Sequence, residues 1–129
     1  MWTNFLSNKK PWTSIFGETN ISPTLNISYA IFRGSSILLK ISSPMQGSEY
    51  PKKWLNLGYN TYEFDLLFSN IKRIEITDFN FSGPANLSVK KNGQDHEVEL
   101  TIGETSIVKF IAQSISTMNI SAFHDDGAV

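Results

Sequence analysis

From residue 23 onward, apolar and polar residues alternate along short runs that are separated by turn residues. A period of two is typical of β-strands with one buried face, because successive side chains of a strand point to opposite sides. The runs recur roughly every ten residues, as they do in all-β sandwiches and barrels. We therefore expect an all-β fold with an antiparallel sheet of about eight strands, closed as a sandwich or as a partly open barrel.

Turn residues divide these runs into hairpins. The first has Arg33-Gly34-Ser35 at its turn. Its leading strand is expected to bury one row of side chains, namely Leu25, Ile27, Tyr29 and Ile31. A second hairpin is expected to join the strand 62–68 to a return strand 71–79 through Ser69-Asn70, with charges on its outer face. Asn92-Gly93 predicts a further hairpin, because both residues tolerate the positive φ of a tight turn.

Two segments depart from the alternation. Before residue 17 the apolar residues recur at helical spacing, and Pro11 and Gly17 suit the start and the end of a helical turn, so one or two short turns are expected. Residues 43–60 contain prolines and glycines that interrupt any period, which predicts a long loop. This loop carries Trp54, which either folds back over the edge of the core or waits for a partner.

Composition narrows the class of protein. A chain of 129 residues with a hydrophobic share of 40% suits one compact domain, residues 1–129. The net charge of −1 gives no basic field for nucleic acid. Without cysteine there is no disulfide, thiolate catalysis or sulfur-based zinc site, and a reducing compartment is the simplest setting. No signal-peptide pattern and no apolar run of about 18 residues is found, so we expect a cytoplasmic protein without a membrane span.

Residues able to carry catalysis are sparse. His96 and His124 lie outside any metal-binding spacing and are expected at the solvated surface. No nucleophile elbow or phosphate loop is present. Glu63 and Asp65 share a strand face, as a glycosidase pair would, but a solvated face that pairs with Arg73 is the simpler interpretation. We expect no catalytic residue, no metal site and no cofactor.

Acidic and aromatic side chains are the remaining surface candidates. One acidic group, on the second predicted hairpin, comprises Glu63, Asp65 and Glu75, and a later one comprises Glu97, Glu99 and Glu104. Together they would suit a basic partner, although the solubility of outer strand faces explains them more simply. The aromatics near turns or out of phase are Trp12, Phe32, Trp54 and Phe79. Such residues either anchor an interface or close the end of a core.

The order of several features resembles that of a known family. The segments concerned are Trp12-x-x-Ile15-Phe16-Gly17, Pro23-Thr24-Leu25, Pro51-x-x-Trp54, the strand Tyr62–Phe68 and Ile74-Glu75-Ile76. In these the chain resembles the immunity protein 50 family, small proteins found beside bacterial polymorphic toxins. The resemblance covers about residues 10–80, and the rest matches only as further β-strands. Family members often carry His or Asp where this chain has Asn26 and Ile27, which weakens the case for a polar role there.

The resemblance implies a cytoplasmic antidote in bacterial contact-dependent inhibition. Such an immunity protein of a toxin–antitoxin pair binds the C-terminal domain of its cognate toxin and needs no catalysis. The residues predicted to contact the toxin are Trp54, Glu63, Asp65 and Glu75.

The residues themselves leave two other functions open. A carrier of a small apolar ligand would enclose a cavity lined by Tyr29, Phe64 and Phe110. A structural subunit of a phage or secretion assembly would add strands between copies at an exposed sheet edge. The identity of the toxin and the oligomeric state stay open.

Overall fold

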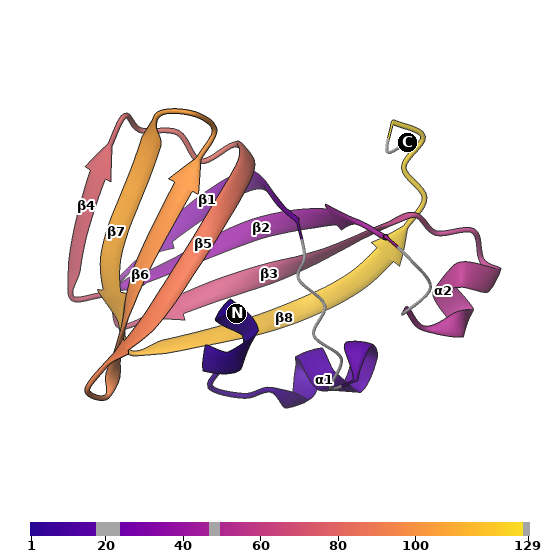
Figure 1. The fold of residues 1–129 in the computed structure, drawn as a ribbon, viewed down its shortest axis with the longest axis horizontal. Helices are drawn as coiled ribbons and strands as arrows, with labels where there is room; N and C mark the ends of the chain where they lie inside the picture. The colour runs from indigo at the N-terminus through magenta and orange to yellow at the C-terminus, as the bar shows by residue number, and fades with distance from the viewer. Residues whose placement is uncertain (18–23, 47–49, 128–129) are drawn as a thin grey trace.

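The computed structural model describes residues 1–17, 24–46 and 50–127. The strands are β1 (Leu25–Arg33), β2 (Ser36–Pro44), β3 (Thr61–Ser69), β4 (Arg73–Thr77), β5 (Gly83–Asn92), β6 (Asp95–Ile102), β7 (Ser106–Ala112) and β8 (Ser114–Phe123). They form one antiparallel sheet of eight strands in the order β4-β7-β6-β5-β1-β2-β3-β8 (Figure 1). The predicted all-β, antiparallel class is confirmed, and two of the predicted hairpins, β1–β2 and β5–β6, form. The turn of the second consists of Gly93 and Gln94 rather than Asn92 and Gly93, because Asn92 ends β5 opposite Asp95.

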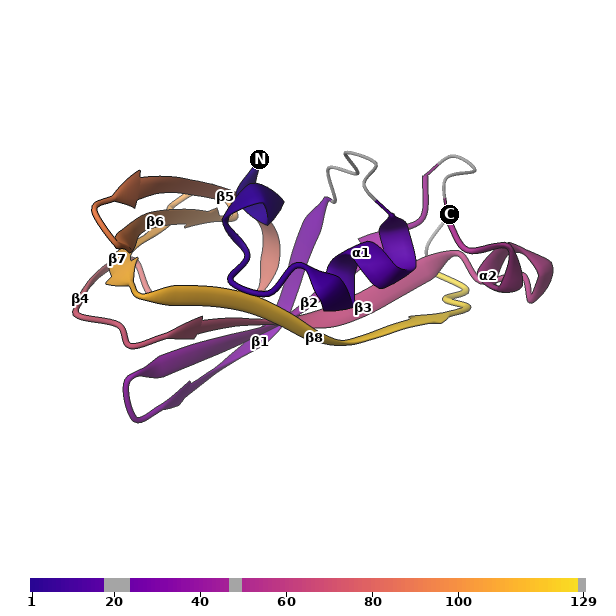
Figure 2. The same ribbon diagram turned by 90° about the horizontal axis from the view of Figure 1, so that it is seen from below.

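The sheet bends where β1 meets β5, because these strands pair only along Leu25–Ile27. On one side of the bend lies the β3 half-sheet (β1, β2, β3 and β8), and on the other the β7 half-sheet (β5, β6, β7 and β4), as Figures 1 and 2 show. The rings of Phe68 and Phe110, one from each half-sheet, are 4.9 Å apart between centroids. The core therefore lies between the two halves.

Short helices at the N-terminus extend this core along β3. They are a 3-10 helix, η1 (Trp2–Phe5), and α1 (Lys10–Phe16), which Gly17 ends with a φ of 67°. The Trp12 ring lies 5.4 Å from that of Trp2 and 5.2 Å from that of Phe64. The predicted helical turns are confirmed, and Trp12 is a core residue.

Tyr62 belongs to this aromatic cluster and makes stability depend on pH. Burial raises the pKa of its hydroxyl well above the ordinary value of 10.0, an effect that outweighs the opposing influence of Ser43. A hydroxyl whose pKa is higher in the folded than in the unfolded state adds to the free energy of unfolding. This contribution is complete below the unfolded-state pKa and is lost as the pH rises above that pKa. We expect the free energy of unfolding to fall by up to about 1.4 kcal/mol per pH unit above pH ~10. Denaturant titrations of Tyr62→Phe, which lacks the hydroxyl, should show a smaller fall over that range; an equal fall would contradict the assignment.

A β-bulge changes which residues of β1 face the core. The register with β2 shifts between Ile27 and Tyr29, so the alternation inverts after the bulge. Tyr29 stands opposite Lys40 on the outer face and is 48% exposed, and Ile31 is 41% exposed. The prediction that Tyr29 and Ile31 belong to the core is therefore wrong, whereas Leu25 and Ile27 are buried as expected.

The predicted hairpin between β3 and β4 does not form, because β4 pairs with β7. Asn70 adopts a left-handed φ of 53°, which turns the chain away from β3. The next two amide groups donate across the molecule, from Ile71 to the Ser35 carbonyl at 2.8 Å and from Lys72 to the Ile111 carbonyl at 2.9 Å. The chain thus crosses from one half-sheet to the other, and the return strand ends at Thr77 rather than at residue 79.

The predicted loop 43–60 contains a short helix, α2 (Lys52–Asn56), and residues 47–49 lie outside the described ranges. Trp54 of α2 is half-buried, with its ring 6.0 Å from that of Phe16 and 6.3 Å from that of Tyr62. It folds back over the end of the core, which was one of its two expected roles.

The histidines occupy different environments. His124 is exposed as predicted, and its Nε2 lies 2.8 Å from an Asp126 carboxylate oxygen. His96 is 5% exposed, so its predicted place at the solvated surface is wrong. Its ring lies 6.0 Å from that of Phe5, and its Nδ1 lies 3.4 Å from the Ala112 carbonyl oxygen. On β6, His96 lies two residues before Val98 and therefore points to the same, inward side. This alternation is visible in the sequence and is the signal that indicates a buried His96.

Candidate protein-binding face

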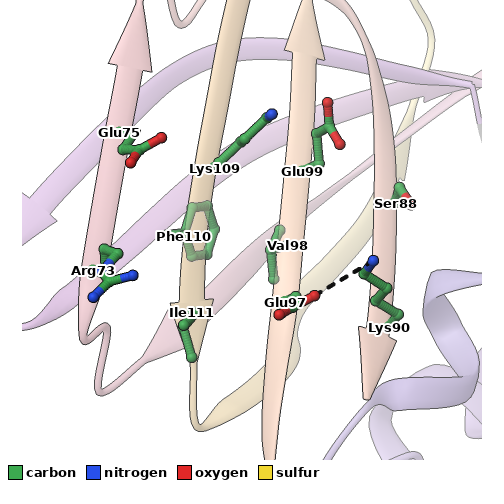
Figure 3. A pocket seen from close by; sticks show the side chains of 10 residues that line it. All are labelled: Arg73, Glu75, Ser88, Lys90, Glu97, Val98, Glu99, Lys109, Phe110 and Ile111. Atoms are coloured by element: carbon green, nitrogen blue, oxygen red, sulfur yellow. Dashed lines mark ion pairs between the residues drawn. The ribbon is translucent and has the colours of Figure 1, made fainter. Parts of the chain in front are cut away.

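The outer face of the β7 half-sheet carries charged side chains around a shallow hollow of about 370 Å³ (Figure 3). We call this surface the charged face, and its outward residues are Arg73, Glu75, Ser88, Lys90, Glu97, Glu99, Lys109 and Ile111. They come from β4, β5, β6 and β7, and the alternate residues of β6 and β7 form the core on the other side. A regular sheet therefore holds all of them at fixed spacing.

The pairing register aligns these residues in rows. One row places Glu75 opposite Lys109, and Lys109 opposite Glu99. All three are exposed. Within the described ranges, no ion pair of 4.0 Å or less joins them, although their signs alternate. Their charges are therefore available to an incoming partner.

The neighbouring row contains the one ion pair that is drawn in Figure 3. Lys90 Nζ lies 3.5 Å from a Glu97 carboxylate oxygen, and the two residues stand directly opposite each other. The Lys90 side chain is 78% exposed, so this pair contributes little to stability. Arg73 stands at the far end of the row, beyond Ile111. The charges of the basic and acidic side chains on this face balance. Such a mixed-charge surface favours binding of a specific partner over general electrostatic attraction.

The sequence predicted only part of this face. Glu75 was expected as a contact residue, and Glu97 and Glu99 as part of an acidic surface, and the structure brings these three together. Arg73 was expected on the same strand face as Glu75, but neither Arg73 nor Lys109 was predicted to lie beside Glu97 and Glu99. The alternation along each strand already indicated that these side chains point outward. The strand order that brings them together could not be predicted from that alternation.

Glu63 and Asp65 lie elsewhere, on the outer face of the β3 half-sheet. Lys40 of β2 stands between them, with its Nζ 3.5 Å from a Glu63 oxygen and 3.4 Å from an Asp65 oxygen. Asn119 donates a hydrogen bond of 2.8 Å to Asp65, whose side chain is only 12% exposed. The predicted pairing with Arg73 is wrong, because β4 does not pair with β3.

The pKa of Lys40 reflects this arrangement. Burial lowers it, but attraction to Asp65 and Glu63 outweighs burial and raises the pKa above the ordinary value of 10.5. The lysine thus stays charged and neutralises part of the acidic pair. Asp65 in particular has the environment of a structural residue.

Trp54 also lies apart from the charged face. It borders a surface groove of about 490 Å³ between α1, α2 and β8, together with Ile15, Leu57 and Tyr59. The four predicted contact residues are therefore distributed over three surfaces. Only Glu75 lies on the charged face.

Other kinds of site find no support in the described part of the chain. No group of three or more metal-ligating side chains occurs among residues 1–17, 24–46 and 50–127. In the same ranges, no helix is long and apolar enough to span a bilayer.

No protein-family model matches the chain, and neither a curated protein nor a solved structure is significantly similar to it. The resemblance to the immunity protein 50 family stays a prediction. The arrangement of the charged face can therefore be judged only on its own chemistry, which is that of a rigid, mixed-charge surface with a central hollow.

Proposed function

We propose that this protein is an immunity protein that binds the C-terminal domain of a bacterial toxin in the cytoplasm and blocks it by direct contact. The charged face supports this proposal most strongly. It presents exposed charges of both signs, held in register by four strands, around a hollow that an incoming side chain can fill. The sheet fixes the backbone of these residues before binding, so little backbone ordering cost arises on association.

The carrier of a small apolar ligand has weaker support. Its expected lining residues do not share a side, because Tyr29 lies on the outer face while Phe64 and Phe110 are buried in the packed core. Phe110 is in ring contact with Phe68, and Phe64 with Trp12, so these side chains fill the space between the half-sheets.

A subunit that adds strands at a sheet edge also has weaker support. At the edge strand β8, the Ser7 amide donates to the Ile115 carbonyl at 2.8 Å, and the Ile115 amide donates to the Ser7 hydroxyl at 3.3 Å. The N-terminal segment thus covers part of this edge. Covered edges are a common protection against strand addition.

The test is a growth assay with a pull-down. The chain is co-expressed with the toxin-like C-terminal domain encoded beside its gene, and we expect restored growth together with a stable complex. A domain inactivated in its own active site gives the complex without selection for survival. Absence of both rescue and binding would reject the immunity function and bring the carrier forward.

A further inference from the structure

The segment between β4 and β5 exposes an aromatic side chain that the charged face does not include. Phe79 is 74% exposed, the largest exposed fraction among the large hydrophobic residues described. Its ring lies 5.2 Å from that of Phe81, which in turn lies 5.4 Å from that of Phe32. Phe81 is buried, so a chain of ring contacts connects Phe79 to the core.

Hydrogen bonds hold this segment in place. The Asn80 carbonyl accepts a hydrogen bond of 3.2 Å from the Ser106 hydroxyl, and the Asn80 side chain accepts one of 3.0 Å from the Ser82 amide. The Gly103 amide donates to the Pro84 carbonyl at 2.8 Å and ties the neighbouring turn to the start of β5, where the segment ends. Phe79 is thus presented by a fixed backbone, which lowers the entropy cost of ordering it in a complex.

The charges next to Phe79 are acidic. Asp78 precedes it, is exposed, and has a left-handed φ of 55° that sets the direction of the chain beyond β4. Glu104 is exposed in the turn between β6 and β7 and follows Gly103, where an added β-carbon would lie 3.8 Å from the Asn80 side-chain nitrogen. Arg33, which follows Phe32, lines a different hollow with Ile31 and Leu38. The complement of this surface is an apolar pocket with a basic rim.

We propose that Phe79 is the anchor of the toxin interface, inserted into an apolar pocket of the toxin domain whose rim carries Lys or Arg opposite Asp78 and Glu104. This inference rests on the proposed function. Rigid aromatic side chains that are exposed in the free protein and buried in the complex carry most of the affinity in many interfaces. The segment that carries Phe79 begins directly after β4, a strand of the half-sheet that bears the charged face, where Thr77 stands opposite Ile107 of β7.

The experiment measures the affinity and the dissociation rate of the purified chain for the inactivated toxin-like domain encoded beside its gene. For Phe79→Ala we expect a dissociation constant about 30-fold higher, mainly through faster dissociation. The matched control is Tyr29→Ala, an aromatic of 48% exposure on the other half-sheet, which should change affinity by less than about threefold. Thermal unfolding of Phe79→Ala should match that of the unchanged chain, because little of its surface is buried.

A second variant pair tests the rim. Asp78→Asn with Glu104→Gln should slow association and flatten its dependence on salt, because neutral side chains no longer attract a basic rim. If the unchanged chain binds the toxin domain but Phe79→Ala loses less than about tenfold in affinity, the anchor is refuted and the immunity function stands. If the unchanged chain does not bind, the proposed function itself fails, and the anchor with it.

Discussion

Replacing Phe64 by alanine should lower the free energy of unfolding by about 3–5 kcal/mol, the range found when a buried phenylalanine is truncated. Phe64 is fully buried, and its ring contacts those of Trp2, Trp12 and Tyr62 at 6.0, 5.2 and 6.2 Å. The truncation leaves a cavity between β3 and the N-terminal helices, and rings of this size cannot collapse to fill it without leaving their rotamers. A domain of this length has a total stability of about 5–15 kcal/mol, so much of it would be lost.

Urea titration followed by tryptophan fluorescence measures this effect directly, since Trp2 and Trp12 report on the same cluster. Phe79→Ala serves as the matched control, because it removes the same side chain from an exposed position and should change stability by less than about 0.5 kcal/mol. Comparable losses for the two variants would show that this cluster does not form the core.

Under the proposed immunity function, reversing one charge on the charged face should disrupt binding of the toxin domain. Glu99→Lys places a like charge opposite Lys109 on the protein and opposite whichever basic group of the toxin Glu99 meets. Like charges brought together across an interface cost several kcal/mol, so we expect at least a tenfold rise in the dissociation constant and loss of growth rescue. Within the protein the same reversal should cost less than about 1 kcal/mol, because both side chains are exposed.

Asp126→Lys is the control for this prediction. It makes the same change in net charge at an exposed position near the C-terminus, where the side chain pairs only with His124 among the described residues. Isothermal titration calorimetry at physiological salt separates the local effect from a general one, since exposed charges are screened beyond about 8–10 Å. Equal losses for both variants would indicate that net charge, and not the charged face, governs binding.

Local features of the sequence predicted the fold class well. The hairpin turn at Gly93, the Arg33-Gly34-Ser35 turn and the helical segment between Pro11 and Gly17 depend on residues that lie close together in the chain. Their backbone preferences act within a few residues, so they can be identified without the rest of the molecule.

The errors at Tyr29 and in the strand order arose where pairing with strands far away in sequence decides the structure. Alternation alone places Tyr29 in the core. The bulge after Ile27 inverts the two faces of the strand, and no residue near it indicates a bulge in the sequence. Strand order is decided in the same way. β4 pairs with β7 because the chain crosses between half-sheets after Asn70, and this alone brings Glu75 beside Lys109 and separates it from Glu63.

The pairing of β3 with β8 has a consequence for synthesis of the chain. Thr61 stands opposite Phe123, so the β8 partner of β3 is synthesised after all four strands of the β7 half-sheet. Until β8 is available, β3 pairs with β2 alone, and its other edge exposes unpaired backbone amide and carbonyl groups. Completing this half-sheet waits for a contact of long sequence separation, and such contacts slow folding. During that interval the open edge of β3 can pair with strands of other chains, which makes the newly synthesised protein prone to aggregation.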